Sequence, residues 1–152
     1  MKSKILVTGA SGAIGPRVVH ALDQAGCQIR AFSIDAPKAG MFPQSVEVLV
    51  GDVTDQLAVQ SAMRGVDAVV HMAALLHIVN PLPELREKYE RVNIGGTATV
   101  VEAAIKAGVK RVVLSARLLY MGLQTVTCSM RCRLLILTLF TLGPNVQPNR
   151  LS

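Results

Sequence analysis

The sequence predicts an α/β fold in which helices cover both faces of a doubly wound parallel sheet. Short apolar runs alternate with amphipathic, helix-like stretches between residues 5 and 114. Right-handed crossovers place a helix on one face of such a sheet after each strand. A cluster of glycines also separates the first apolar run from the first helical stretch, as is typical where a strand turns sharply into a helix.

The first strand is the apolar run 5–7, which is typical of a strand buried on both faces. The first helix is expected at 16–25, because apolar side chains recur there at helical spacing. Pro16 stands in its first turn and Gly26 directly after its last residue. Both are favoured at those positions, so the two ends of this helix are well marked.

Strands two and three are expected at 28–34 and 46–50, with a proline- and glycine-broken segment between them. A second helix is expected at 55–64. Thr54 is its expected N-cap and Gly65 its expected end.

Strand four is expected at 66–72, a long helix at 84–107 ended by Gly108, and strand five at 111–114. Beyond Ser115 this α/β rhythm stops, so the sheet is expected to be truncated after about five strands and followed by an irregular tail.

The 152-residue chain has a formal net charge of +6, but the excess belongs to its tail. All ten acidic residues lie in 1–115, whereas 116–152 carries four arginines and no acid. These arginines have few aromatic neighbours that would form a stacking surface, so nucleic-acid binding is not expected. The most apolar stretch, 134–142, has nine residues against the roughly 20 of a spanning helix, so no membrane segment is expected.

The three cysteines, Cys27, Cys128 and Cys132, are too few and too scattered for a disulfide framework or a four-ligand zinc site. No metal site is therefore expected. The first apolar run is too short for a secretory signal peptide. The chain is expected in a reducing cytoplasm.

The strongest motif is TGASGAIG at residues 8–15, between the first strand and the first helix. Glycines allow a tight turn and a close approach of the backbone to a pyrophosphate, which the positive end of the helix attracts. Gly9, Gly12 and Gly15 suit that role. An acidic residue about 20 positions further on completes the dinucleotide fingerprint, and Asp35 lies twenty residues after Gly15.

Four motifs in order carry a resemblance to a known family: TGASGAIG at 8–15, GDVTD at 51–55, HMAA at 71–74 and VNIGGTATVVEAAIKAGVKRVVLS at 92–115. Residues 4–115 closely resemble the extended short-chain dehydrogenase/reductase family, specifically its NAD-dependent epimerase/dehydratase group. The resemblance implies a Rossmann-like, NAD(P)-binding domain over 1–115. It also allows a homodimer.

By the resemblance, backbone groups of the glycine-rich turn would hold the pyrophosphate, residues after the third strand would border the adenine, and small residues after the fourth would line the cofactor. The expected cofactor-binding residues are Gly9, Ser11, Gly12, Ala13, Ile14, Gly15, Asp35, Asp52, Val53, Met72, Ala73, Ala74 and Asn93. Asp52 is alternatively a turn residue. By the resemblance, Asn93 would support the neighbouring strand and the active site; it is alternatively an ordinary polar residue of a helix.

The cofactor is expected to be NAD, with NADP not excluded. Counting from Gly15, Ser33 stands where NAD-preferring members usually carry their acid, and Asp35 follows two residues later. An acid at this place accepts ribose hydroxyls and repels a 2′-phosphate. Asp35 therefore favours NAD modestly.

The histidines differ in their expected roles. His20 in the first helix and His71 in the fourth strand are expected to be structural. His77 follows the fourth strand, where the family opens its substrate pocket, so a substrate contact there stays open beside a structural role.

The family's catalytic Tyr-Lys pair, in a YxxxK motif, is absent: the last lysine is Lys110. Ser115 and Tyr120 resemble the start and end of the segment that follows strand five in the family, and Ala116 occupies the position of its catalytic hydroxyl. For Tyr120, a packing residue near the edge of the sheet is the favoured alternative. Residues 116–152 are therefore a divergent tail, for which an altered reading frame is favoured over an evolved truncation. Its apolar segment 134–140 is expected to form a strand or a helix beside strand five.

Three functions follow. The leading one is the dinucleotide-binding portion of an NAD-dependent epimerase/dehydratase acting on a nucleotide sugar or related alcohol, inactive alone because YxxxK is missing. The second is a non-catalytic dinucleotide sensor or regulatory module. The third is a non-functional truncated product.

Overall fold

The computed structural model describes residues 2–75, 83–115 and 133–137. Its elements follow in chain order: β1 (Lys4–Thr8), α1 (Gly15–Gln24), β2 (Gln28–Ser33), β3 (Glu47–Val50), α2 (Gln56–Ala62), β4 (Ala68–His71), α3 (Pro83–Tyr89), the π-helix η1 (Glu90–Gly95), α4 (Gly96–Lys106), β5 (Arg111–Ser115) and β6 (Arg133–Leu137). The predicted strands and helices are all present, with ends within two residues of those expected.

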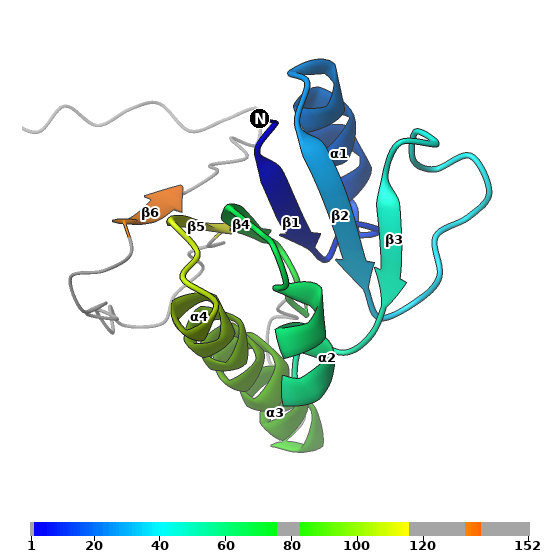
Figure 1. The fold of residues 1–152 in the computed structure, drawn as a ribbon. Helices are drawn as coiled ribbons and strands as arrows, with labels where there is room; N and C mark the ends of the chain where they lie inside the picture. Colours follow the sequence, from blue (N-terminus) through cyan, green and yellow to red (C-terminus); the bar gives the residue numbers. More distant parts are fainter. Residues whose placement is uncertain (1, 76–82, 116–132, 138–152) are drawn as a thin grey trace, which may run out of the picture.

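The strands form one parallel sheet in the order β3-β2-β1-β4-β5-β6 (Figure 1). The chain moves outward from β1 to β3 and then returns to the other side of β1 with β4. The order therefore reverses between β1 and β4, and the predicted doubly wound α/β fold is confirmed. Ligands of such sheets bind beyond the carboxyl ends of the strands at this reversal.

The sixth strand comes from the tail, from the segment for which the sequence left a strand or a helix open. Arg133–Leu137 pairs in parallel with Arg111–Ser115 of β5. The tail segment thus covers an edge of β5 that would otherwise present free backbone groups.

Two apolar cores lie on the two faces of the sheet. On one face Leu6 of β1 packs with residues of α2 and α4, including Val59 and Val100. On the other face Val7 packs with Val19 of α1, and Figure 1 shows α1 on the opposite side of the sheet from α2 and α4. Consecutive residues of β1 thus enter different cores, as the unbroken apolar run predicts. Full burial of each such side chain contributes about 1.5–3 kcal/mol.

The start of α2 differs from the expectation. Asp55, not Thr54, is the N-cap: its Oδ1 accepts hydrogen bonds from the N–H groups of Leu57 (2.9 Å) and Ala58 (3.2 Å). Asp55 has the extended backbone of a capping residue, with φ −85° and ψ 107°. The end at Gly65 is as predicted, with a φ of +69° that suits glycine.

The long helix expected at 84–107 is present as one continuous helical segment, but its helix type changes along its length. Residues 90–95 form a π-helix between α3 and α4, and the capping residues Tyr89, Gly95 and Gly96 keep right-handed helical dihedral angles. Gly96 faces Val53, because a Cβ at Gly96 would lie 2.8 Å from Val53 Cγ2. A close approach of α4 to the loop after β3 therefore requires glycine here.

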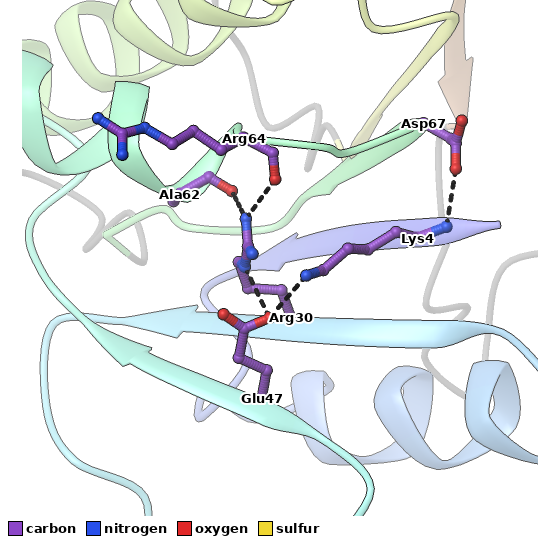
Figure 2. Close-up of polar contacts among 6 residues, drawn as sticks. All are labelled: Lys4, Arg30, Glu47, Ala62, Arg64 and Asp67. Atoms are coloured by element: carbon purple, nitrogen blue, oxygen red, sulfur yellow. Dashed lines mark hydrogen bonds and ion pairs between the residues drawn. The ribbon is translucent and has the colours of Figure 1, made fainter. Parts of the chain in front are cut away.

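A buried arginine ties β2 to its neighbours at the end of the sheet opposite the glycine-rich turn (Figure 2). Arg30 Nη1 donates to the carbonyl oxygens of Ala62 (2.6 Å) and Arg64 (2.8 Å), at the end of α2. Glu47 Oε2 lies 3.0 Å from Arg30 Nε and 2.8 Å from Lys4 Nζ. The guanidinium is thus balanced by one carboxylate and two carbonyl groups.

Both carboxylates of this region have lowered pKa values. Hydrogen bonds from Lys4 and Arg30 hold the pKa of Glu47 below its ordinary 4.5. The backbone N–H of Lys4, with a smaller contribution from Lys110, lowers the pKa of Asp67 below 3.8. Each carboxylate therefore stabilises the fold above its ordinary pKa, and that contribution is lost as the pH falls through the lowered value.

Replacing Glu47 by Gln is expected to lower the free energy of unfolding by at most about 1 kcal/mol, since the carboxylate is half-exposed and solvent screens the pair. Urea titrations at pH 7 measure the change. Glu102→Gln, on the exposed side of α4, is the control. An equal loss in both variants would show that Glu47 has no specific role.

Candidate dinucleotide-binding site

The glycine-rich turn lies at the reversal of strand order, between β1 and α1. Gly9 has a φ of +68°, and a Cβ there would lie 2.6 Å from the nitrogen of Ala73. A Cβ at Gly12 would lie 3.1 Å from Gly9 O, and one at Gly15 would overlap the carbonyl of Ala10. All three sequence-predicted glycines thus stand where the backbone leaves little or no room for a side chain.

The turn presents backbone to solvent at the start of α1. Gly12, Ala13 and Ile14 are exposed, and α1 begins at Gly15 without a side-chain cap from Ile14. The first N–H groups of a helix are free to bind an anion, and the helix dipole favours negative charge there. The turn carries no acidic side chain that would compete. This geometry suits a pyrophosphate.

The other side of the turn is fastened to the end of β2. The N–H of Gly9 donates to Phe32 O (2.8 Å), and the N–H of Ser11 donates to Ser33 Oγ (3.0 Å). Ser33 is buried, whereas Asp35 lies two residues past β2 and is exposed. Ser33 therefore positions the turn, and the proposed contact of Asp35 with the ribose stays a prediction.

Of the two residues expected beside the adenine, Asp52 forms a turn. Its Oδ1 accepts from Thr54 N (2.9 Å) and its carbonyl from Asp55 N (3.0 Å). Val53 is buried and packs in the core. The turn interpretation of Asp52 has direct support in these bonds, while an adenine contact of either residue stays a prediction.

The segment after β4 borders the glycine-rich turn. Ala73 touches Gly9, and its N–H lies 3.4 Å from Thr8 Oγ1, which also receives the N–H of Met72 at 3.3 Å. Ala74 is exposed. Met72 and Ala73 are thus brought beside the turn, while the contact of Met72, Ala73 and Ala74 with a cofactor stays a prediction.

Asn93, in the π-helix, binds the far end of this segment. Its Oδ1 accepts from Leu75 N (2.8 Å), and its Nδ2 donates to Leu75 O (3.2 Å). Both main-chain groups of Leu75 are therefore occupied by one side chain. Asn93 supports the strand end rather than acting as an ordinary exposed polar residue; its contact with a cofactor stays a prediction.

His71 has no exposed surface to offer a substrate. It is buried, with Thr8 Oγ1 2.6 Å from its Nδ1 and Thr97 Oγ1 3.0 Å from its Nε2. Burial lowers the pKa of His71 to about 4, so the ring is neutral at pH 7. His20 is exposed and lies 3.2 Å from Met41 O.

Thr8 and Thr97, the two hydrogen-bond partners of His71, are not among the site residues expected from the sequence. Thr8 directly precedes the glycines and is fully buried at the end of an apolar strand, a combination that calls for a hydrogen-bond partner. That position was the signal for Thr8 that the sequence contained.

Ser115 ends β5, whereas His77 and Tyr120 lie outside the described residues.

No group of three or more His, Cys, Asp or Glu side chains within 2–75 and 83–115 is placed to hold a metal ion. In the same part of the chain, no helix is long and apolar enough to cross a membrane.

The strand order and the glycine-rich turn at its reversal define a dinucleotide-binding Rossmann domain of the extended short-chain dehydrogenase/reductase type. The chain belongs to the 3-beta hydroxysteroid dehydrogenase/isomerase family, whose sequence model matches residues 6–122. The resemblance stated from the four motifs is thereby confirmed.

Two curated relatives illustrate the range of this similarity. The chain is 34% identical over 127 residues to a 3 beta-hydroxysteroid dehydrogenase/Delta 5→4-isomerase of Mycobacterium tuberculosis, covering 81% of this chain and 34% of the relative. It is 36% identical over 122 residues to a UDP-glucose 4-epimerase of Azospirillum brasilense, covering 74% and 33%. The chain thus spans about one third of the length of these relatives.

Solved structures show the same partial match. A short-chain dehydrogenase/reductase superfamily protein of Agrobacterium tumefaciens with bound NAD is 35% identical with a TM-score of 0.65, covering 74% of this chain and 32% of the other. The UDP-glucose 4-epimerase of Thermus thermophilus, in complex with NAD, is 28% identical with a TM-score of 0.67, covering 74% and 37%. NAD, the cofactor expected from the sequence, is the dinucleotide bound in both.

Proposed function

We propose that this chain is the NAD-binding portion of an epimerase or dehydrogenase that acts on a nucleotide sugar or a related alcohol. The observation that carries the proposal is the contact of Gly9 with Ala73 at the strand-order reversal, beside the uncapped start of α1. Two elements thereby meet backbone to backbone at the strand-order reversal, where dinucleotides bind in folds of this class. The NAD-bound relatives support the choice of dinucleotide.

The residues divide the binding of the cofactor between them. Backbone N–H groups of Ala13 and Ile14, with the start of α1, would bind the pyrophosphate, and Asp35 would accept the adenosine ribose hydroxyls. Met72 to Ala74 would border the remainder of the cofactor. NAD supplies a hydride acceptor and donor when bound. The UDP-glucose 4-epimerases and the hydroxysteroid dehydrogenase among the relatives support a sugar or alcohol substrate.

The chain is proposed to be inactive alone. The proton transfer that accompanies hydride transfer needs an acid/base group, and no YxxxK motif occurs in the 152 residues. NAD binding without turnover of UDP-glucose is therefore the expected behaviour of the isolated chain.

Calorimetric titration with NAD tests the proposal, and one saturable site is expected. Asp35→Asn is expected to weaken NAD binding about tenfold and to narrow the preference for NAD over NADP, since it removes the charge that repels a 2′-phosphate. Glu102→Gln, on exposed α4, serves as the matched control. Absence of NAD binding at millimolar concentration would refute the proposed function; equal binding by Asp35→Asn would refute only the role of Asp35.

A second candidate is a non-catalytic dinucleotide sensor, for which the apolar tail 116–152, with four arginines and no acidic residue, is the motivating observation. A stable partner complex that is lost when residues 117–152 are removed would favour it. A monomer that is indifferent to the deletion would argue against it.

A further inference from the structure

The buried imidazole of His71 joins two parts of the candidate site that are far apart in the sequence. His71 ends β4 and lies opposite Thr8 in the register of β1. Its Nδ1 is 2.6 Å from Thr8 Oγ1, and its Nε2 is 3.0 Å from Thr97 Oγ1 on α4. One ring thus bridges the residue before the glycine-rich turn and the helix that follows Asn93.

The partners of the two threonines fix the tautomer of the ring. Thr97 gives its only hydroxyl hydrogen to Asn93 O (2.6 Å), so its oxygen accepts from His71 Nε2–H. At the other end, Thr8 Oγ1 already faces the N–H groups of Met72 and Ala73, so its hydrogen is free to be donated to Nδ1. Both ends require the neutral ring with hydrogen on Nε2.

The same bonds hold the segment after β4 from both sides. Thr8 receives the N–H groups at its start, and Asn93 binds both main-chain groups of Leu75 at its end. His71 connects Thr8 to Asn93, because its ring also bonds Thr97 and the hydroxyl of Thr97 donates to the carbonyl oxygen of Asn93. The N–H of Met72 also donates to Thr8 O (3.1 Å), so the imidazole adds a side-chain link to this backbone pairing.

We propose that His71, held as the Nε2–H tautomer, is a positioning residue for the dinucleotide: by linking Thr8 to Thr97 it sets the spacing between the glycine-rich turn and the segment Met72–Leu75. This inference rests on the proposed function. It assigns His71 no proton transfer and no contact with the cofactor. Its effect is on the distance between the glycine-rich turn and the segment Met72–Leu75 before NAD binds.

The test removes both hydrogen bonds of the Thr97 hydroxyl, to His71 Nε2 and to Asn93 O, at a residue remote from the turn. Thr97→Val keeps the shape of the side chain but deprives His71 Nε2–H of its acceptor. Thr97→Ser restores the hydroxyl. Thr99→Val is the matched control, because Thr99 lies on the same helix and donates to Gly95 O (3.0 Å) without touching His71.

Two readouts are taken on the full 152-residue chain: NAD affinity by calorimetry, and the ring nitrogen resonances of His71 by NMR. Thr97→Val is expected to bind NAD about tenfold more weakly than the parent chain, and its His71 resonances are expected to depart from those of the Nε2–H tautomer. Thr97→Ser and Thr99→Val are expected to bind NAD within about twofold of the parent affinity. A merely structural role of Thr97 would lower the melting temperature of Thr97→Val without weakening its binding of NAD.

The outcomes are distinguishable. If the parent chain binds no NAD, the proposed function fails and this inference fails with it. If the parent binds NAD and Thr97→Val binds it equally well, only the inference is overturned. An Nδ1–H signature for His71 in the parent chain would also overturn it, whatever the affinity for NAD.

Discussion

Replacing Gly9 by Ala is expected to abolish measurable NAD binding and to lower the free energy of unfolding by about 3 kcal/mol or more. A residue with a side chain pays about 1–2 kcal/mol to adopt the positive φ at this position. The added Cβ would also lie 2.6 Å from the nitrogen of Ala73 and 2.7 Å from its Cα. Backbone atoms cannot change rotamer to relieve the overlap as a flexible side chain can. The glycine-rich turn and the segment after β4 must therefore move apart.

Gly95→Ala is the matched control for this substitution. Gly95 has right-handed helical dihedral angles, and a Cβ there meets nothing within 4 Å. Alanine is favoured over glycine inside a helix by roughly 1 kcal/mol, so this variant is expected to be as stable as the parent or more so. Calorimetry and urea unfolding measure both variants. Retained NAD affinity in Gly9→Ala would contradict the assignment of the turn.

The stability of the fold is expected to fall by about 3 kcal/mol as the pH is lowered from 6.5 to 4, because of His71. Burial lowers its pKa from 6.5 to about 4. Between these two values the unfolded chain binds a proton that the folded chain does not, so acid favours unfolding. The stabilising contribution is complete above pH 6.5 and is lost as the pH falls towards the folded-state value.

Urea unfolding between pH 7 and 4.5 isolates this effect, because Glu47 and Asp67 lose their contributions only below their ordinary pKa values of 4.5 and 3.8. His71→Asn is expected to flatten the pH dependence, even if its stability at pH 7 is lower. His20→Asn, which changes an exposed histidine, is expected to keep the dependence of the parent. A parent chain of constant stability across this range would contradict the buried, neutral state of His71.

The elements of the fold were predictable because their signals are local. The buried strand at Lys4–Thr8 is visible as an apolar run, and the end of α2 is visible as Gly65, which alone accepts the required φ without strain. The glycine-rich turn was predictable for the same reason, since Gly9 and Gly15 satisfy a steric demand of the backbone. The resemblance to a known family then indicated how these strands, helices and turns combine into one domain.

The features of the fold and of the candidate site that could not be predicted depend on contacts between residues distant in the sequence. Arg30 reads as a charged residue inside a strand, and the carbonyl groups that bind it come from the end of α2. Thr54 and Asp55 are both capping residue types, and backbone angles decide between them. The partnership of His71 with Thr97 requires the packing angle of α4 on the sheet, which no local pattern contains.

The π-helix between α3 and α4 has a consequence for changes in chain length. A π-turn contains one residue more than an α-helical turn, so removing one residue from Glu90–Gly95 would convert this segment to regular α-helix. A π-turn completes its rotation with the extra residue included, so the deletion would leave the side chains of α3 and α4 facing as they do now. This segment is therefore the place where the loss of a single residue is absorbed without rotating either helix.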